Sequence, residues 1–441
     1  MDFDWLIPVI TAIMIYACIY YAIKKYHFMP NVFDFMGPCI MIKTKHTGIF
    51  DKLSKPKKLL IAYADTGVIL TAICAVCVTL LFVVTAYLTL IVHPEPTEVQ
   101  NLLLIPGVNE YVPSTFAVWF SIVFAMVIHE CGHGILSRAE DIKVKSAGLL
   151  TLVIPIGAFV EPDEKDVEAA PLRTKLRMFA AGITNNLFAG TICLVILILL
   201  LGMIVPGTSP YIYGIYDGYP AQDAGVPAGM AVTSIDGVNV KCIGDISDIL
   251  NKTSPGQTVT ISGTYKSKPC SYDITLTSIP SDKMTNVIQD TSGSGFAGIS
   301  FSQPSMITDA LYKITHPKTP INALSSFTSF IVLPFSSITG FNMLSFISSD
   351  TPDSEILSAP FFGFWEIIHL LFWCAWLNIL LGIFNALPAG IFDGGQMLRE
   401  SMRAWFVKHG KDENTAFMIC STITYMLIVI IIIPILMPYL F

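Results

Sequence analysis

The feature that most constrains this chain is the recurrence of long apolar runs. Six of them lie at 5–23, 61–92, 114–137, 176–205, 361–387 and 415–440. A helix needs about 20 apolar residues to cross the hydrocarbon core of a bilayer. Only 13% of the 441 residues are charged, whereas soluble domains carry about 25%. The sequence therefore predicts an α-helical polytopic membrane protein with six transmembrane helices.

The charges between the runs predict which side of the membrane each loop faces, because cytoplasmic loops are enriched in Lys and Arg. Eight lysines lie in 24–58, and basic residues also dominate 138–177 and 399–411, whereas 93–113 contains neither Lys nor Arg. We expect the three basic segments at the cytoplasmic side, and the N-terminus and residues 206–360 at the other. The net charge of −7 argues against a nucleic-acid partner.

The third apolar run ends in the sequence VIHECGHGIL, which places His129 and His133 four residues apart. On a helix these side chains project from one face, so both imidazoles can bind one zinc ion. Zinc lowers the pKa of a bound water to about 7, and Glu130 is placed to take a proton from that water. The motif H-E-x-x-H therefore predicts a hydrolytic metal site; the alternative is a buried His–Glu cluster that only packs the bundle.

A third metal ligand is expected because zinc usually takes three protein ligands and keeps one position open. Asp393 lies in the sequence NALPAGIFDGG, just past the fifth apolar run. The charge bias places this end and the HECGH end of the third run at the cytoplasmic side, hence at the same depth. The alternative for Asp393 is an ordinary turn aspartate.

The segment 146–160 is apolar but too short to span a membrane as a helix. Pro155 and Gly157 also interrupt a helical pattern. We expect a re-entrant β-hairpin, since non-helical backbone is tolerated at membrane depth where protein or a water-filled cavity shields it. Its strand edge could hold an unwound peptide. An interfacial loop remains the alternative.

These motifs together resemble the site-2 protease family of intramembrane zinc metalloproteases. The family patterns N-x-x-P-x-x-x-x-D-G and G-x-x-x-N are present as Asn385, Pro388, Asp393 and Gly394, and as Gly182 and Asn186. The stretch 219–240 resembles a PDZ domain, a fold that binds peptides or chain ends by strand addition. The resemblance implies that Asn186 and Asn385 orient the substrate backbone or the developing oxyanion; the alternative is that they join helices by hydrogen bonds.

The same resemblance implies a multi-pass protein of the cell membrane that acts as a zinc metalloendopeptidase, a hydrolase with one Zn²⁺ per chain. Its substrates would be single-span membrane proteins, cut in their transmembrane helices near the cytoplasmic face. The PDZ-like domain would lie outside the cytoplasm and bind a peptide or chain end, with the active site toward the cytoplasm. The alternative is a membrane scaffold or receptor that keeps a vestigial metal site, and an ion transporter would need more midplane carboxylates.

These expectations divide the chain into five parts. Residues 1–113 hold two transmembrane helices and a basic cytoplasmic loop, and 114–205 hold the first part of the catalytic core. Residues 206–300 form the PDZ-like domain, and 301–360 an external amphipathic connector. Residues 361–441 hold the last core helix, the Asp-Gly motif and a C-terminal transmembrane helix. Whether Cys242 and Cys270 form a disulfide is open at this point.

Overall fold

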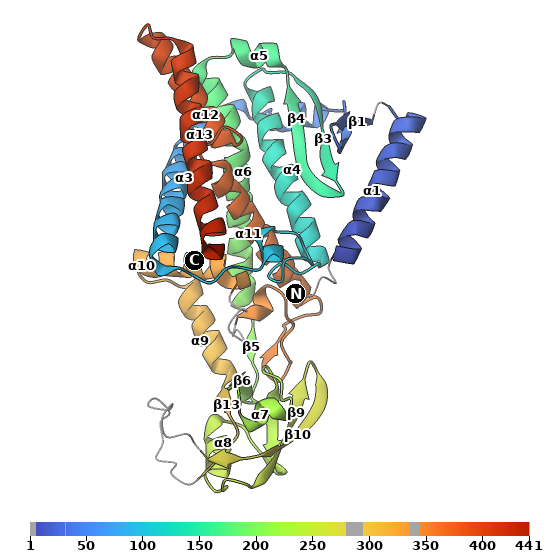
Figure 1. The fold of residues 1–441 in the computed structure, drawn as a ribbon, viewed down its shortest axis with the longest axis vertical. Helices are drawn as coiled ribbons and strands as arrows, with labels where there is room; N and C mark the ends of the chain where they lie inside the picture. The colour runs from blue at the N-terminus through green and yellow to red at the C-terminus, as the bar shows by residue number, and fades with distance from the viewer. Residues whose placement is uncertain (1–5, 31, 279–293, 336–343, 441) are drawn as a thin grey trace. The chain divides into compact units, whose positions relative to one another are not determined.

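The computed structural model describes residues 6–30, 32–278, 294–335 and 344–440. The chain divides into two compact units (Figure 1). Unit 1 comprises Met1–Cys193 and Trp373–Phe441, and unit 2 comprises Leu194–Phe372. Helices α6 and α11 each begin in one unit and end in the other.

Long helices dominate unit 1. The described helices are α1 (Leu6–Tyr26), α2 (Gly48–Leu53), α3 (Lys57–Val92), α4 (Phe116–Ala139), α5 (Glu164–Ala169), α6 (Leu172–Leu201), α11 (Phe364–Asn385), α12 (Asp393–Lys408) and α13 (Glu413–Leu436). Six of them, α1, α3, α4, α6, α11 and α13, are long and apolar enough to cross a membrane. The long apolar helices expected of a membrane protein are therefore present.

The interior of unit 1 is built on the second half of α11. Trp373 and Trp376 are each only 1% exposed, and their rings meet edge to face with centroids 5.5 Å apart. Ser121 Oγ of α4 lies 3.1 Å from Cys374 Sγ of α11. Because small polar groups in apolar helices find partners on neighbouring helices, this contact fixes α4 against α11.

A four-stranded antiparallel sheet lies beside α4 (Figure 1). Its strands, in spatial and chain order, are β1 (Phe33–Met36), β2 (Cys39–Thr44), β3 (Val144–Leu152) and β4 (Ile154–Pro162). Strand β2 pairs with β3 through a register that sets Ile40 opposite Thr151. The Tyr16 hydroxyl of α1 accepts the Ile40 N–H at 3.1 Å, which joins α1 to the sheet. Strands β1 and β2 lie inside 24–58, which the sequence analysis had treated as a basic loop.

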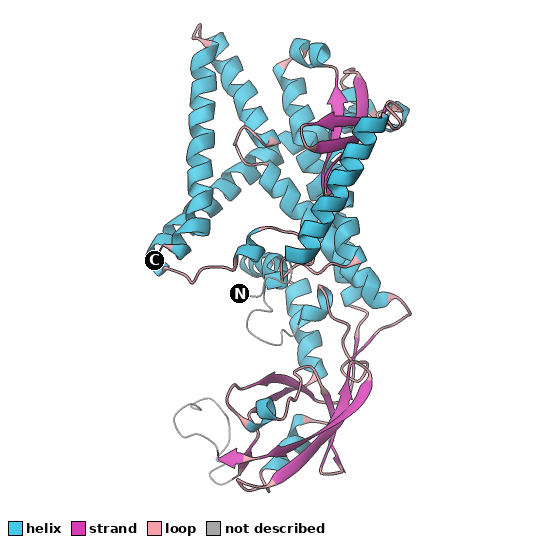
Figure 2. Cartoon of the chain, turned by 45° about the vertical axis from the view of Figure 1, so that its right-hand side comes forward, coloured by secondary structure: helices cyan, strands magenta, loops and turns pink. Residues whose placement is uncertain are grey.

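Unit 2 contains a six-stranded sheet (Figure 2). The described helices and strands of unit 2 are β5 (Val205–Pro206), β6 (Tyr211–Ile215), α7 (Pro220–Asp223), β7 (Ala231–Ile235), β8 (Val238–Asn239), α8 (Ile243–Leu250), β9 (Thr258–Tyr265), β10 (Lys268–Thr275), β11 (Thr277–Ser278), β12 (Gly295–Phe296), β13 (Ile299–Ser302), α9 (Pro304–Thr315), α10 (Pro320–Val332) and β14 (Leu357–Ser358). The sheet runs β10-β9-β7-β6-β13, and β8 pairs with β7. Alternate residues of its strands, among them Ile212, Val232 and Ile261, form one buried core.

Parts of the expected insert fall outside the described residues. The range 206–300 includes 279–293, and the connector 301–360 includes 336–343. Both Cys242 and Cys270 carry free thiols, so the described structure contains no disulfide between them.

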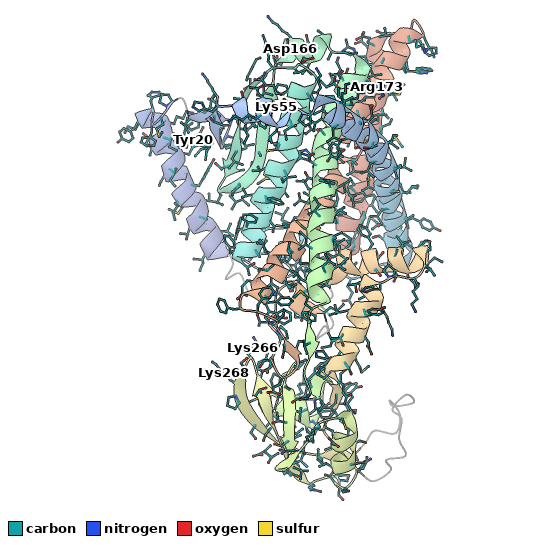
Figure 3. The ribbon with its side chains drawn as sticks, turned by 180° about the vertical axis from the view of Figure 1, so that it is seen from behind. Tyr20, Lys55, Asp166, Arg173, Lys266 and Lys268 are labelled. Atoms are coloured by element: carbon teal, nitrogen blue, oxygen red, sulfur yellow. The ribbon has the colours of Figure 1, made fainter. Side chains whose placement is uncertain are left out.

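A cluster of ion pairs around the buried Arg177 joins three helices of unit 1. Arg177 of α6 donates from Nε to Asp65 of α3 at 2.7 Å and from Nη1 to Glu140, which follows α4, at 2.8 Å. Arg173, one turn earlier and labelled in Figure 3, donates to the same aspartate at 2.8 Å. Because one guanidinium engages two carboxylates, this cluster sets the spacing of α3, α4 and α6.

Candidate metal centre

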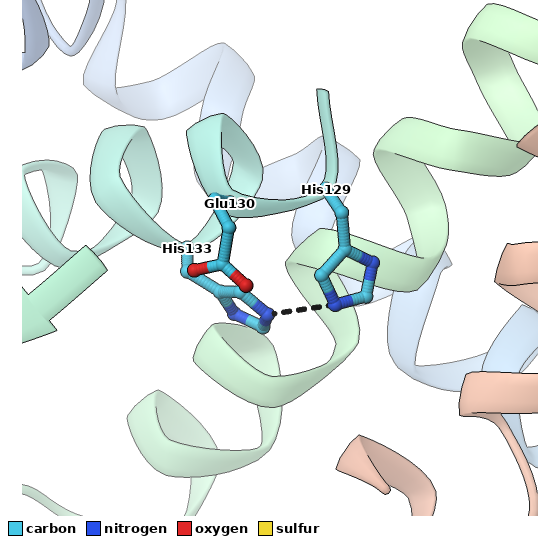
Figure 4. A group of neighbouring side chains, drawn as sticks. All are labelled: His129, Glu130 and His133. Carbon is cyan, nitrogen blue, oxygen red and sulfur yellow. Dashed lines mark hydrogen bonds between the residues drawn. The ribbon is translucent and has the colours of Figure 1, made fainter. Parts of the chain in front are cut away.

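Two imidazoles of α4 face each other at the centre of the site. His129 and His133 lie one helical turn apart, and their Nε2 atoms are 3.2 Å apart (Figure 4). Helix α4 begins after Thr115, whose side chain accepts the Val118 N–H. His133 Nδ1 lies 2.8 Å from the carbonyl oxygen of Met178 on α6. A ring that donates from Nδ1 to a carbonyl keeps the lone pair of Nε2 free for a metal.

Asp393 completes a triangle with the two histidines. Its Oδ2 atom lies 3.0 Å from His129 Nε2 and 3.3 Å from His133 Nε2. In a tetrahedral zinc site with bonds of about 2.0–2.1 Å, neighbouring ligand atoms lie roughly 3.3 Å apart. Asp393 Oδ2 is buried, and apart from the imidazoles it has no partner among the described atoms. The three atoms therefore fit the ligand set of one zinc ion.

Two glycines allow Asp393 to reach the histidines. Asp393 is the first residue of α12, after a turn that follows α11. A Cβ at Gly394 would lie 2.1 Å from the carbonyl oxygen of Ala386, and a Cβ at Gly395 would lie 1.9 Å from that of Ala389. Any larger residue would therefore push the start of α12 away from the turn, and Asp393 with it.

An ion pair also joins α12 to α6. Glu400 lies on α12, two turns after Asp393, and its Oε2 is 3.3 Å from Lys175 Nζ on α6. Both side chains are largely buried. This pair could not be predicted from the sequence, because the two residues are far apart along the chain and neither belongs to a motif.

Glu130 lies on the same stretch of helix, next to the triangle. One ligand atom from each of His129, Glu130 and His133 falls within 4.8 Å of the others. Glu130 Oε2 accepts the backbone N–H of Val160 at 2.8 Å. Strand β4 is an outer strand of its sheet, so this bond shows that the free edge of β4 faces the glutamate.

The two asparagines singled out in the sequence lie on helices near the site. Asn186 is fully buried and donates from Nδ2 to the carbonyl of Ala125 on α4 at 3.3 Å. Asn385 donates to the carbonyl of Leu381 in its own helix at 2.9 Å. A third asparagine, Asn185, was missed: it accepts the Tyr63 hydroxyl at 3.0 Å and donates to the Ile128 carbonyl at 3.3 Å. The repeated Asn in GITNN was the only signal for it.

Gly182 lies directly against the imidazoles. A Cβ there would come within 2.6 Å of His133 Nε2 and 2.7 Å of His129 Nε2. Distances under 3.0 Å are not tolerated without movement. The absence of a side chain at Gly182 therefore leaves room for both Nε2 atoms to keep their positions.

We expect Gly182→Ala to weaken metal binding by at least about tenfold, because the added methyl group displaces both ligand nitrogens. Metal analysis of the purified protein during titration with a chelator would measure the change. Gly214→Ala is a matched control, since a Cβ at Gly214 would meet no atom within 4 Å. Equal metal retention in the two variants would contradict the role given to Gly182.

The chain matches a known peptidase family over most of its length. The model of peptidase family M50 matches residues 116–431, a range that includes the two histidines, Glu130 and Asp393. A segment of 95 residues is 32% identical to an uncharacterized protein of Methanocaldococcus jannaschii, covering 21% of this chain and 25% of that protein. A segment of 171 residues is 27% identical to the membrane-bound transcription factor site-2 protease homolog of Arabidopsis thaliana, covering 36% of this chain and 33% of that protein.

These matches thus span a quarter to a third of the length of the two relatives. Among solved structures, the PDZ domain of the SdrC-like protein from Listeria monocytogenes is 28% identical, with a TM-score of 0.18. That match covers 22% of this chain and 90% of the domain.

Proposed function

Because this chain belongs to peptidase family M50, we propose that it is an intramembrane zinc endopeptidase that hydrolyses peptide bonds of transmembrane helices. The observation that carries the proposal is the triangle of His129 Nε2, His133 Nε2 and Asp393 Oδ2, with edges of 3.0 to 3.3 Å and Glu130 beside it. The relative from Arabidopsis thaliana, a site-2 protease homolog by name, supports the same class of reaction.

In this proposal His129, His133 and Asp393 hold one zinc ion per chain. When bound, zinc would act as a Lewis acid that polarises the scissile carbonyl and lowers the pKa of water, so that the water can lose a proton at neutral pH. Glu130 takes a proton from the attacking water and passes it to the leaving amine. The Val160 N–H, which donates to Oε2, holds the carboxylate in the orientation for this transfer.

We propose that the free edge of β4 holds the substrate. A helix protects its own peptide bonds, so a transmembrane substrate must unwind before it can be cut. An extended segment can add to an exposed strand edge through main-chain hydrogen bonds. Since Val160 of β4 contacts Glu130, a peptide on this edge would pass next to the catalytic base.

The two asparagines take the role of substrate contacts in the proposal. Each side-chain NH₂ donates one hydrogen to a carbonyl, of Ala125 for Asn186 and of Leu381 for Asn385. The second hydrogen of each NH₂ would donate to the substrate backbone or the developing oxyanion, which requires the fully buried Asn186 to become accessible when substrate binds.

The proposed topology follows the charges of the loops. We propose six transmembrane helices, a hairpin β3–β4 that re-enters the membrane, and a catalytic site toward the cytoplasm. The proposed division places the PDZ-like domain at 206–300, outside the cytoplasm, where it would bind a peptide or chain end of single-span membrane proteins. The connector 301–360 would lie on the outer membrane surface, since α10 exposes Ile321 and Leu324, 79% and 67% accessible.

Cleavage of single-span test proteins by the purified chain in detergent tests the proposal. We expect cleavage within the apolar segment, complete loss of cleavage after removal of metal by a chelator, and recovery when zinc is returned in stoichiometric amount. Mass spectrometry of the products locates the cut. Cleavage that persists in the metal-free protein would contradict the proposal.

A further inference from the structure

A cavity of about 520 Å³ lies against one face of the sheet in unit 1. Helix α6 and the short helix α5 supply its other walls. Most of the lining is apolar and flexible, with three methionines, two phenylalanines and one leucine: Met36, Met41, Met178, Phe159, Phe179 and Leu150. Methionine-rich walls adapt to apolar groups of different shape.

Pairing in the sheet explains why this face is hollow. Met41 pairs with Leu150, and Leu150 pairs with Gly157. The three residues therefore share one face, in a row that ends in a glycine without a side chain. A Cβ at Gly157 would have no neighbour closer than 3.8 Å, so the space beside Leu150 stays open.

The cavity adjoins the metal centre through two of its lining residues. Val160 donates its N–H to Glu130, and Met178 supplies the carbonyl bonded to His133. A peptide on the edge of β4 has alternate side chains on either side of the sheet. The side chain next to the bond beside Glu130 would therefore reach this cavity.

The rim of the cavity is acidic, although the surrounding loops are basic. Glu161, Glu164 and Glu168 line it, whereas residues 24–58 alone carry eight lysines. Figure 3 shows Lys55 and Asp166 at the same end of the helices of unit 1.

Most acidic groups of this segment already have partners. Asp163 accepts the N–H groups of Lys165 and Asp166 at the start of α5, and the hydrogen bond from Asp166 keeps the pKa of Asp163 below its ordinary value. Asp166 accepts the Lys143 N–H at 3.1 Å, and Glu161 accepts the Ser146 hydroxyl at 2.6 Å.

Glu164 and Glu168 differ from these groups. Neither has a cationic partner in the described part of the chain, and both are exposed. They are four residues apart, so both carboxylates project from the same face of α5. Two carboxylates without a cationic partner in the described part of the chain therefore line a mostly apolar cavity.

We propose that this cavity is the side-chain subsite beside the scissile bond, and that it selects substrates in which a large apolar residue is followed by Lys or Arg. The inference rests on the proposed function and adds a substrate preference to it. Membrane helices carry Lys and Arg just beyond their cytoplasmic ends. Glu164 and Glu168 would pair with these cations while the last apolar side chain fills the cavity.

The test uses single-span proteins with identical transmembrane segments and different flanks. One pair carries Lys-Lys or Gln-Gln after the apolar segment, and a second pair carries Leu or Ala at its last position. We expect kcat/KM to be about tenfold higher for the Lys-Lys substrate at low salt, and the difference to shrink as salt screens the pairs.

Three variants of the chain and one matched control locate the preference. The double variant Glu164→Gln/Glu168→Gln should cut both flanks at similar rates, while the matched control Glu95→Gln/Glu98→Gln should keep the preference. Glu164→Lys/Glu168→Lys should reverse it, favouring an acidic flank. Met41→Trp, which fills the cavity, should slow cleavage of the Leu substrate and spare the Ala substrate.

Binding of the same substrates is measured alongside cleavage, so that failure of the proposed subsite can be distinguished from failure of the proposed protease activity. Cleavage of both flanks at equal rates by the unaltered chain would overturn the subsite. Suppose that the chain binds the Lys-Lys substrate more tightly than the Gln-Gln substrate, that Glu164→Gln/Glu168→Gln removes this difference in Kd, and that neither substrate is cleaved. This result would support the cavity as a binding site and contradict the proposed protease activity.

Discussion

Replacing Glu130 with glutamine is expected to lower kcat by about 10²–10⁴-fold while one zinc ion stays bound per chain. General-base catalysis contributes about 10²–10⁴ to such reactions, and an amide cannot accept the proton at neutral pH. The glutamine oxygen can still accept the Val160 N–H, which Glu130 accepts at 2.8 Å. The loss should therefore come from chemistry and not from unfolding.

Rates of cleavage in detergent and the zinc content of the same preparation measure this outcome. Glu366→Gln is the matched control, since Glu366 also lies in an apolar helix, α11, and is exposed. Its rate should stay close to that of the unaltered chain. Substantial cleavage by Glu130→Gln would remove Glu130 from the role of base.

Replacing Asp393 with alanine is expected to remove the zinc itself and all activity. The Oδ2 atom forms two edges of the ligand triangle, at 3.0 and 3.3 Å. Even partners that only orient a ligand change metal affinity by about 10–100-fold, so the loss of a ligand should exceed that range. Zinc per chain, measured after gel filtration, should fall to near zero.

The control for this variant is Asp309→Ala. Asp309 is an exposed aspartate of α9, so its replacement should leave zinc content and cleavage unchanged. A preparation of Asp393→Ala that keeps one zinc per chain would show that the metal is held by other residues.

The centre could be predicted where it depends on local spacing. His129, Glu130 and His133 follow from helical geometry alone, because residues four apart share a face. The approach of Asp393 followed from loop charges, which set the ends of two helices at one depth. The structure brings these four residues together, and their roles as ligands and base remain predictions for the experiments above.

Contacts between segments that are far apart along the chain could not be predicted from the sequence. Strands β1 and β2 carry the charged residues Asp34 and Lys43, and the turn Gly37-Pro38 joins them, a pattern that is typical of a loop. They are strands because β3 offers an edge more than 100 residues later, as the pair Ile40–Thr151 shows. The pair Lys175–Glu400 could not be predicted for the same reason, since the sequence around a single charged residue does not indicate which distant residue pairs with it.

The wide separation of the proposed metal ligands along the chain has a consequence for biosynthesis. His133 and Asp393 are 260 residues apart (393 − 133), and the whole of unit 2 is translated between them. A chain still on the ribosome therefore carries two imidazoles and a glutamate, but no closed ligand set, until α12 has been made. Under the proposed function, the earlier helices would enter the membrane before the growing chain could cleave a peptide bond.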